Sequence, residues 1–344
     1  MDKVALLTAA ERSELFRESA ARRGMSPAVI EKDFWVCWVL KQLFAEPSFN
    51  ERIVFKGGTS LSKVFGLIDR FSEDIDLVLD WRLLGYGAGM EDRRQELDSL
   101  TKRDRFSKAV NRKAAEYIAG TLIHDLTRLM ARCPQVSAVV DVIDPHSVNI
   151  SYPASFSVDY IRPEVVLEIG PLASWVPSAS HSIRPYAAEE FPQLFAEPEC
   201  QVIATSAERT FWEKATILHQ QAHRRGPMPL RYSRHYYDLY KLAASPVSTS
   251  AIADLGLLRD VVAFKQRFYP SGWARYEDAV PGSFKLIPAN AHLAELRRDY
   301  SSMEVMIQGQ IPDFGEIIDT LRLLEEQINK LARPPADWPA EALC

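Results

Sequence analysis

Residues 53–79 constrain the fold more than any other part of the chain. Ile53-Val54-Phe55 is a short apolar run of the kind found in strands, and Gly57-Gly58-Thr59-Ser60 follows it as a glycine turn. From Asp74 to Leu79, one face carries Asp74, Asp76 and Val78 and the other carries Ile75, Leu77 and Leu79, which predicts a second strand with two chemically different faces. Between the turn and this strand, apolar residues recur at helical spacing and predict a helix carrying Leu61, Val64, Phe65 and Ile68. The segment therefore predicts a strand, glycine turn, helix and strand in succession.

The other periodic segments divide the chain into a strand-rich first half and a helical second half. The first half contains predicted helices from Ser26 to Leu43 and from Asp104 to Met130, and strands at Ala138–Ile143, Val148–Tyr152 and Val165–Ile169. The second half contains predicted helices at Ala207–His223, Ser233–Ala243, Ile252–Phe264 and Phe314–Leu331. The proline-rich stretch from Pro177 to Pro198 is interpreted as the connection. We expect an α+β fold, bilobed, in which a mixed sheet with helices (1–195) precedes a mainly helical C-terminal domain (196–344).

Composition narrows the class of protein. Lys and Arg number 41 against 46 Asp and Glu, a net charge of −5, so any nucleic-acid contact depends on local patches. The longest apolar run, from Phe34 to Leu40, is far shorter than the roughly 18 to 20 residues that span a bilayer. No signal-peptide pattern is present, and four scattered cysteines without a C-x-x-C pair are expected to be free thiols. We expect a cytoplasmic protein with no membrane association.

Asp74 and Asp76 form the first candidate site. Side chains two residues apart on a strand point to the same side, so both carboxylates are able to share Mg²⁺ or Mn²⁺. The glycine turn presents backbone N–H groups at a helix N-terminus, where the triphosphate of an NTP binds well, and Lys63 is placed to add a cation. The candidate nucleotide-binding residues are thus Gly57, Gly58, Thr59, Ser60 and Lys63. The alternative is a simple turn followed by a solvated, acidic start of a strand.

Glu168 is the candidate for a third carboxylate. Such a group on a neighbouring strand either holds a second metal ion or takes the proton of an attacking hydroxyl. Glu168 lies within an apolar strand, where an unpaired charge is costly unless it faces a cleft or a metal. Asp141 and Asp159 are its rivals, and the alternative is a glutamate on an edge strand that faces water.

The chain resembles the AbiEii/AbiGii toxin family of nucleotidyltransferases, relatives of the DNA polymerase β superfamily and of the MenT toxins. The resemblance is carried by IEKDFWV (30–36), FKGGTSLSK (55–63), FSEDIDL (71–77), ERTFWEK (208–214), RYSRHYYDLY (231–240), Asp299-Tyr300 and the helix 314–329. It implies a toxin of a toxin–antitoxin or abortive-infection (phage-defence) system, encoded beside an antitoxin, that moves a nucleotide from an NTP to an acceptor. In relatives the acceptor is the 3′ end of tRNA.

The family's motifs fall on the glycine turn and the two aspartates, and its later motifs on Lys214 and Asp238. From the residues alone, Lys214 either reaches a phosphate or is an exposed lysine paired with Glu213 or Glu208. Asp238 either orients Lys214 or a metal-bound water, or forms an ion pair with Arg234 one helical turn away.

Two basic stretches are candidates for RNA contact. Residues 102–113 carry six Lys or Arg against one Asp, and residues 221–235 carry Arg224, Arg225, Arg231 and Arg234 with no acid. Such stretches suit phosphate contacts, which confer affinity without sequence choice. A solvated helix face is the alternative for the first stretch.

Other classes of function have less support. His219 and His223 have the spacing of a zinc-binding helix, but the glutamate of that motif is a glutamine here, which favours a polar helix face. No P-loop, dinucleotide-binding or nucleophile-elbow pattern occurs. Two alternatives stay open: a toxin that binds a nucleotide or RNA without transfer, and transfer to a protein acceptor.

Overall fold

The computed structural model describes residues 1–86, 99–157, 161–172 and 176–332, which form two compact units. Of the described chain, the first unit contains residues 1–64, 71–86 and 105–205, and the second contains 65–70, 99–104 and 206–332. The main division therefore lies at Thr205 and Ser206, beyond the boundary expected after residue 195. In addition, the short segment 65–70 groups with the second unit although both of its neighbours along the chain belong to the first.

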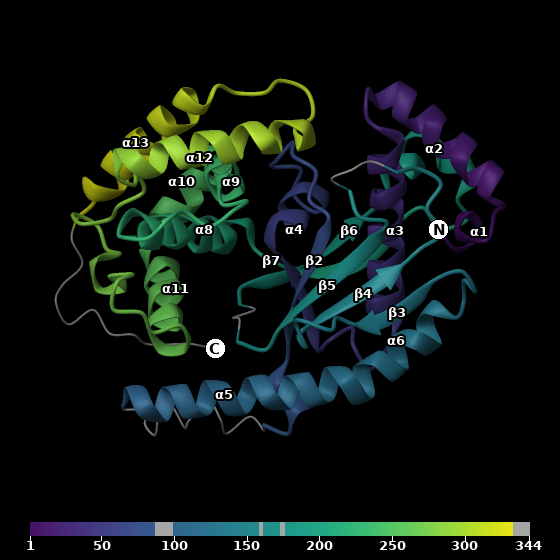
Figure 1. The fold of residues 1–344 in the computed structure, drawn as a ribbon, viewed down its shortest axis with the longest axis horizontal. Coiled ribbons are helices and arrows are strands. Elements are labelled where there is room, and N and C mark those ends of the chain that lie inside the picture. The colour runs from purple at the N-terminus through teal and green to yellow at the C-terminus, as the bar shows by residue number, and fades with distance from the viewer. Residues whose placement is uncertain (87–98, 158–160, 173–175, 333–344) are drawn as a thin grey trace. The chain divides into compact units, whose positions relative to one another are not determined.

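A mixed sheet forms the core of the first unit. Its described strands follow the order β3-β4-β5-β2-β1-β7-β6 (Figure 1). β2 runs parallel to β5 and antiparallel to β1, while β1 runs parallel to β7. This confirms the expected α+β class. The strands are β1 (Ile53–Lys56), β2 (Asp74–Leu79), β3 (Ser137–Val140), β4 (Ser147–Ser151), β5 (Glu164–Gly170), β6 (Ser178–Ile183) and β7 (Cys200–Thr205).

The interpretation of residues 177–198 as a plain connection was wrong. This stretch contains β6, helix α7 (Tyr186–Glu190) and a 3-10 turn at Pro192–Leu194. β6 is an edge strand in which three of the six residues are serines, and most of its side chains are exposed. It therefore carries no apolar alternation that periodicity could detect. β7 was also missed, and it extends the sheet to the end of the first unit.

Helices flank the sheet in the first unit. α3 begins at Pro27 after Ser26, as predicted, although the Ser26 side chain makes no capping hydrogen bond. Its side chains are buried on all sides, and it packs against β5 and β7 (Figure 1). The helices up to residue 130 are α1 (Asp2–Ala5), α2 (Ala9–Arg23), α3 (Pro27–Ala45), α4 (Gly57–Lys63), α5 (Leu100–Tyr117) and α6 (Ile123–Met130), with a 3-10 turn at Trp81–Leu84. A π-helical turn at Ile118–Leu122 interrupts the single helix expected from Asp104 to Met130.

α4 is shorter than expected and starts earlier. It begins at Gly57 itself and ends at Lys63, whereas the apolar spacing predicted a helix reaching Ile68. Gly66 has φ +61°, which is incompatible with a continuing right-handed helix. The helix therefore cannot reach Ile68, and residues 65–70 belong to the second unit.

The second unit is helical, as expected. Its helices are α8 (Ala207–Ala222), α9 (Ser233–Ala243), α10 (Pro246–Ala253), α11 (Leu255–Phe268), α12 (Asn290–Met303) and α13 (Phe314–Asn329), with 3-10 turns at Tyr276–Asp278 and Glu304–Met306. α9 packs against α8, α10, α12 and α13 (Figure 1). The helix expected at 252–264 is divided, because the Asp254 side chain accepts a hydrogen bond from Leu257 N and starts a new helix. α12 was not predicted.

Two expectations concern the whole chain. In the part that the structure describes, no helix is both long and apolar enough to cross a membrane. Cys37, Cys133 and Cys200 are free thiols, as expected, and Cys344 lies outside the described residues.

Candidate functional site

Gly57 and Asp76 are in direct contact in the first unit. The register of β1 and β2 pairs Lys56 with Asp76, so the carboxylate lies beside the start of α4. Gly57 has φ +81°, and a Cβ atom at this position would lie 1.9 Å from Asp76 Oδ2 and 3.2 Å from Asp76 Cβ. Glycine is thus required here twice, by its backbone conformation and by the close approach of a carboxylate. The contact joins the two motifs that the sequence singled out.

The hydroxyl groups of the glycine motif maintain its shape. Thr59 Oγ1 donates a hydrogen bond to the carbonyl oxygen of Asp74, and Ser60 Oγ donates to the carbonyl oxygen of Gly57 at 2.9 Å. Both side chains are buried, as is Gly58. The first turn of α4 is therefore attached to the beginning of β2, and these hydroxyls have partners within the protein.

Asp74 and Asp76 lie on one face of β2, as predicted. Both are half-buried, whereas Ile75 and Leu77 on the opposite face are buried. The parallel register pairs Asp76 with Glu168 on β5, so Glu168 points to the same side of the sheet as both aspartates. Glu168 is exposed. The expected neighbouring carboxylate is therefore present on the adjacent strand.

Asp141 and Asp159 were the other candidates for the third carboxylate. Asp141 is occupied in the turn between β3 and β4, where Oδ1 accepts hydrogen bonds from Ile143 N at 2.8 Å and Asp144 N at 2.9 Å. Its Oδ2 accepts a third from Asn149 Nδ2 at 2.9 Å. Asp159 lies outside the described residues. Among the residues that are described, no three His, Cys, Asp or Glu side chains converge into a ready metal site. Two half-exposed carboxylates still fit Mg²⁺, which takes further ligands from phosphate and water.

The structure corrects the expectation for Lys63. Its Nζ lies 2.8 Å from Asp33 Oδ1, and the two side chains are 5% and 2% exposed. The same ammonium lies 3.7 Å from the centre of the Tyr186 ring. Burial lowers the pKa of Lys63, but the Asp33 carboxylate outweighs burial and raises the pKa above its ordinary value. Lys63 is thus a buried ammonium group whose charge is paired with Asp33, so it is not available to bind a triphosphate.

In the second unit, Asp238 on α9 joins two cations. Its carboxylate accepts hydrogen bonds from Arg70 Nε at 2.6 Å and Arg70 Nη2 at 2.8 Å, and Lys214 Nζ lies 2.9 Å from Oδ2. Asp238 is fully buried. Burial alone would raise its pKa, but the charges of Arg70 and Lys214 hold the pKa well below its usual range. Asp238 is therefore an ionised, fully partnered group.

Sequence reasoning missed Arg70. It is 168 residues from Asp238, and no local pattern links the two positions. The alternative interpretation of Lys214, as an exposed lysine paired with Glu213 or Glu208, was wrong. Lys214 on α8 is 7% exposed and pairs with Asp238, while Glu213 pairs with Arg209 at 3.2 Å and Glu208 accepts a hydrogen bond from Ser250.

His235 completes the surroundings of Lys214. The Lys214 ammonium lies 3.1 Å from His235 Nδ1. Burial and the nearby Lys214 charge lower the pKa of His235 well below its ordinary value, so the ring is neutral and its Nδ1 accepts the hydrogen bond. Burial also lowers the pKa of Lys214, although Asp238 opposes this effect. Lys214 is thus a cation whose proton is held less tightly than that of an exposed lysine.

The two basic stretches present exposed charge. On α5, Lys102, Arg105, Lys108 and Arg112 are exposed. The second stretch contains the loop between α8 and α9, where Arg225 and Arg231 are exposed. This loop is tied to α12, because Asp299 accepts hydrogen bonds from Arg231 N and Ser233 N, and Glu295 accepts one from Met228 N.

The histidine pair on α8 has a structural role. His219 Nε2 lies 2.9 Å from the carbonyl oxygen of Arg275, and His219 Nδ1 accepts a hydrogen bond from Lys285 N at 3.0 Å. His223 Nδ1 lies 2.9 Å from the carbonyl oxygen of His219. Both ring nitrogens of His219 thus have protein partners, and the ring is buried inside the unit and does not form part of a polar helix face.

Comparison with known proteins gives one family. Residues 38–325 match the family described as the nucleotidyltransferase AbiEii toxin of a type IV toxin–antitoxin system. The matched range contains the glycine motif, both aspartates of β2, Lys214 and Asp238. A search of curated proteins gives no significant match.

Solved structures give similar folds. MenT4, a nucleotidyltransferase toxin from Mycobacterium tuberculosis, is 16% identical with a TM-score of 0.53, over 95% of this chain and 91% of that one. JHP933 from Helicobacter pylori is 15% identical with a TM-score of 0.41, over 85% and 88% of the two chains. At 16% identity the first comparison supports the fold alone, and the second, with a TM-score of 0.41, adds nothing to it.

Proposed function

The chain belongs to the AbiEii family of nucleotidyltransferase toxins of type IV toxin–antitoxin systems, and on that premise we propose a Mg²⁺-dependent transfer of NMP from an NTP to the 3′ end of tRNA. The observation that carries the proposal is the contact between Gly57 and the Asp76 carboxylate. It brings a turn suited to phosphate beside a carboxylate suited to a divalent cation, which is the pairing that nucleotidyl transfer needs.

Each residue of the carboxylate face receives a proposed role. Asp74 and Asp76 would hold Mg²⁺ or Mn²⁺, which when bound neutralises charge on the triphosphate. The backbone N–H groups at the start of α4 would bind phosphate oxygens. The acceptor hydroxyl oxygen forms a bond to the α-phosphorus, the bond from that phosphorus to the bridging oxygen breaks, and pyrophosphate leaves. Glu168, on the same face as Asp76, would accept the hydroxyl proton.

Lys214 receives the role of stabilising negative charge that develops on phosphate oxygens. Its ammonium is supported by Asp238 and by the neutral His235, and Asp238 is in turn held by Arg70. Under this proposal Lys214 touches the reacting phosphate, whereas Asp238 and Arg70 position it.

The acceptor and the partners follow from the same proposal. The basic stretches on α5 and between α8 and α9 would contact tRNA phosphates, and a cognate antitoxin protein would restrain the enzyme. Because NTP and tRNA are both present in the cytoplasm, that is the proposed location. A role in abortive infection, and thus in phage defence, would follow from toxicity released during infection.

The direct test is a labelling assay. The protein is incubated with total tRNA, Mg²⁺ and each α-labelled NTP in turn, beside Asp76→Asn and the surface variant Lys330→Ala. We expect labelled tRNA with at least one NTP from wild type and Lys330→Ala, and none from Asp76→Asn.

The other outcomes separate the alternatives. If the label from the NTP appears on a protein and not on tRNA, the acceptor is a protein. If neither tRNA nor protein is labelled and Asp76→Asn still inhibits growth, the toxin acts by binding a nucleotide or RNA without transfer.

A further inference from the structure

Three consecutive charged residues on α3 are buried. Glu31, Lys32 and Asp33 are 1%, 1% and 2% exposed. Consecutive residues on a helix point about 100° apart, so the three side chains leave α3 in three directions and each enters protein. Burying a charge is costly unless it is paired, and apolar residues of similar size often stabilise a fold as well or better. The partners of these residues therefore indicate what the charges achieve.

Lys32 pairs with Glu73, the residue directly before β2, which carries Asp74 and Asp76. Its Nζ lies 2.5 Å from Glu73 Oε2, and the two side chains are 1% and 8% exposed. Asp74 follows Glu73 in the chain, so this pair fixes the backbone where β2 begins.

Asp33 contacts α4, the helix that contains the glycine motif. Its Oδ1 lies 2.8 Å from the Nζ of Lys63, the last residue of α4, and its Oδ2 accepts a hydrogen bond from Tyr186 N at 2.7 Å. α4 is the helix that starts at Gly57. One turn of α3 is thus bonded to the end of α4 and to the beginning of β2.

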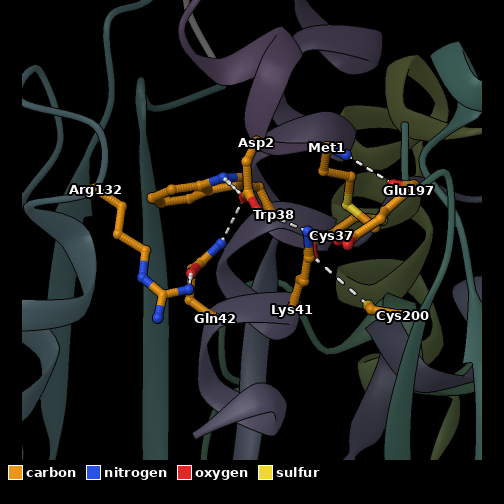
Figure 2. Close-up of polar contacts among 9 residues, drawn as sticks. All are labelled: Met1, Asp2, Cys37, Trp38, Lys41, Gln42, Arg132, Glu197 and Cys200. Carbon is orange, nitrogen blue, oxygen red and sulfur yellow. Dashed lines mark hydrogen bonds and ion pairs between the residues drawn. The ribbon is translucent and has the colours of Figure 1, made fainter. Parts of the chain in front are cut away.

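Glu31 differs from its neighbours because it serves another segment. Its two carboxylate oxygens accept hydrogen bonds from Ser155 N at 2.8 Å and Phe156 N at 3.1 Å, in the chain that follows β4. Lys41, farther along α3, pairs with Asp2 and Glu197 (Figure 2). These contacts do not involve α4 or β2, which makes Lys41 a control on the same helix.

We propose that Lys32 and Asp33 are positioning residues for nucleotidyl transfer, which hold the start of α4 and the carboxylates of β2 at the separation that the reaction requires. The inference rests on the proposed function. Its physical reason is that displacement of reacting groups by about 1 Å costs roughly 100-fold in rate, so a stiff, buried connection between the two motifs has a direct effect on kcat.

The main experiment separates position from stability at the Lys32–Glu73 pair. Lys32→Met leaves a buried carboxylate without its ammonium partner, so both Tm and kcat fall. Adding Glu73→Gln removes that charge, and Tm recovers most of its loss. If the pair positions the motifs, kcat of the double variant stays at least ten-fold below wild type while KM for the NTP changes less. Recovery of kcat together with Tm would overturn the proposal.

Two controls keep the result interpretable. Lys41→Met is expected to retain kcat, and a loss equal to that of the double variant would show that any lysine on α3 has the same effect. Asp33→Asn keeps the acceptor for Tyr186 N and removes the charge opposite Lys63, so it serves if the double variant does not fold. We expect at least a ten-fold lower kcat, and an unchanged kcat would contradict the proposal.

A second measurement does not depend on activity. Hydrogen exchange of peptides covering residues 57–63 and 71–76 is expected to quicken in the folded variants and to stay unchanged in Lys41→Met. If wild type transfers no nucleotide, the proposed function fails by itself, and exchange still decides whether α3 holds these two segments. Wild-type exchange in both segments would rule out the positioning role.

Discussion

The guanidinium group of Arg70 and the carboxylate of Asp238 form a two-point ion pair, with Nε and Nη2 at 2.6 and 2.8 Å from the two carboxylate oxygens. Arg70 lies between α4 and β2 in the chain, and Asp238 lies on α9. Since both residues are buried, the pair attaches the segment between the two sequence motifs to the helix that supports Lys214. The two-point geometry suits arginine and is unavailable to lysine.

Removal of Arg70 should destabilise the protein. Arg70→Met leaves Asp238 with Lys214 as its remaining charged partner in a buried site, and breaking a buried pair costs about 3 to 5 kcal/mol. The free energy of unfolding from urea titration is the measurement. As a control, Arg322→Met removes an exposed pair with Asp319 and should cost under about 1 kcal/mol. Equal, small losses in both variants would show that the Arg70 pair contributes nothing special.

The pH–rate profile should report Lys214. Burial lowers the pKa of Lys214, so if its charge stabilises phosphate, kcat is full below that pKa and falls as pH rises through it, before 10.5 is reached. An arginine does not lose its proton in this range. Lys214→Arg should therefore remove the alkaline fall while retaining some activity, and Lys214→Met should lower kcat about 100-fold at every pH. The same alkaline fall in Lys214→Arg would assign it to another group.

A methyl group at Gly57 should abolish transfer. Gly57→Ala places Cβ 1.9 Å from Asp76 Oδ2 at a φ of +81°, so the carboxylate or the first turn of α4 must shift. We expect transfer to fall at least 100-fold, with about 1 to 2 kcal/mol lost in stability. Gly120→Ala is the matched control, because nothing lies within 4 Å of its added Cβ and φ is ordinary. It should retain activity and gain up to about 1 kcal/mol. Normal transfer by Gly57→Ala would refute the proposed geometry.

Acid should destabilise the protein through His219. Burial lowers the pKa of His219 to about 4, from an ordinary value of 6.5. Between these values the unfolded chain binds a proton that the folded protein does not, so stability falls as pH drops from 6.5 to 4. At about 1.4 kcal/mol per pKa unit, the loss is at most about 3 to 4 kcal/mol.

His219→Gln should remove this part of the pH dependence. The measurements are urea titrations of wild type and variant at pH 7 and pH 4, with NMR titration of the wild-type ring. A His219 ring resonance that titrates near pH 6.5 would contradict the assignment.

Charge in the loop between α8 and α9 should affect the acceptor. Arg225 is exposed, and Arg225→Glu reverses a charge that would face tRNA phosphates. We expect KM for tRNA to rise several-fold, with a weaker salt dependence and an unchanged KM for the NTP. Lys330→Glu reverses an exposed charge directly after α13 and serves as control. If both variants raise KM equally, general charge and not this loop is responsible.

Periodicity succeeded where one strand or helix buries a regular face. The bounds of β2 match the prediction, because Ile75, Leu77 and Leu79 alternate with Asp74, Asp76 and Val78 within six residues. The start of α3 was also found, since Pro27 follows Ser26. Periodicity failed at β6, whose exposed edge buries little, and at α4, which ends at Lys63 although the apolar spacing continues to Ile68.

The sequence by itself determined the chemistry of the carboxylate strand, the glycine turn beside it and the family. These are local features, since two residues on one strand share a face in any fold. Only the tertiary structure decided which charges are neutralised. Lys63 was expected to be a phosphate cation and is paired with Asp33, whereas Asp238 is held by Arg70, 168 residues away. The partner of a buried charge is chosen by how helices and strands pack, and no spacing along the chain records that choice.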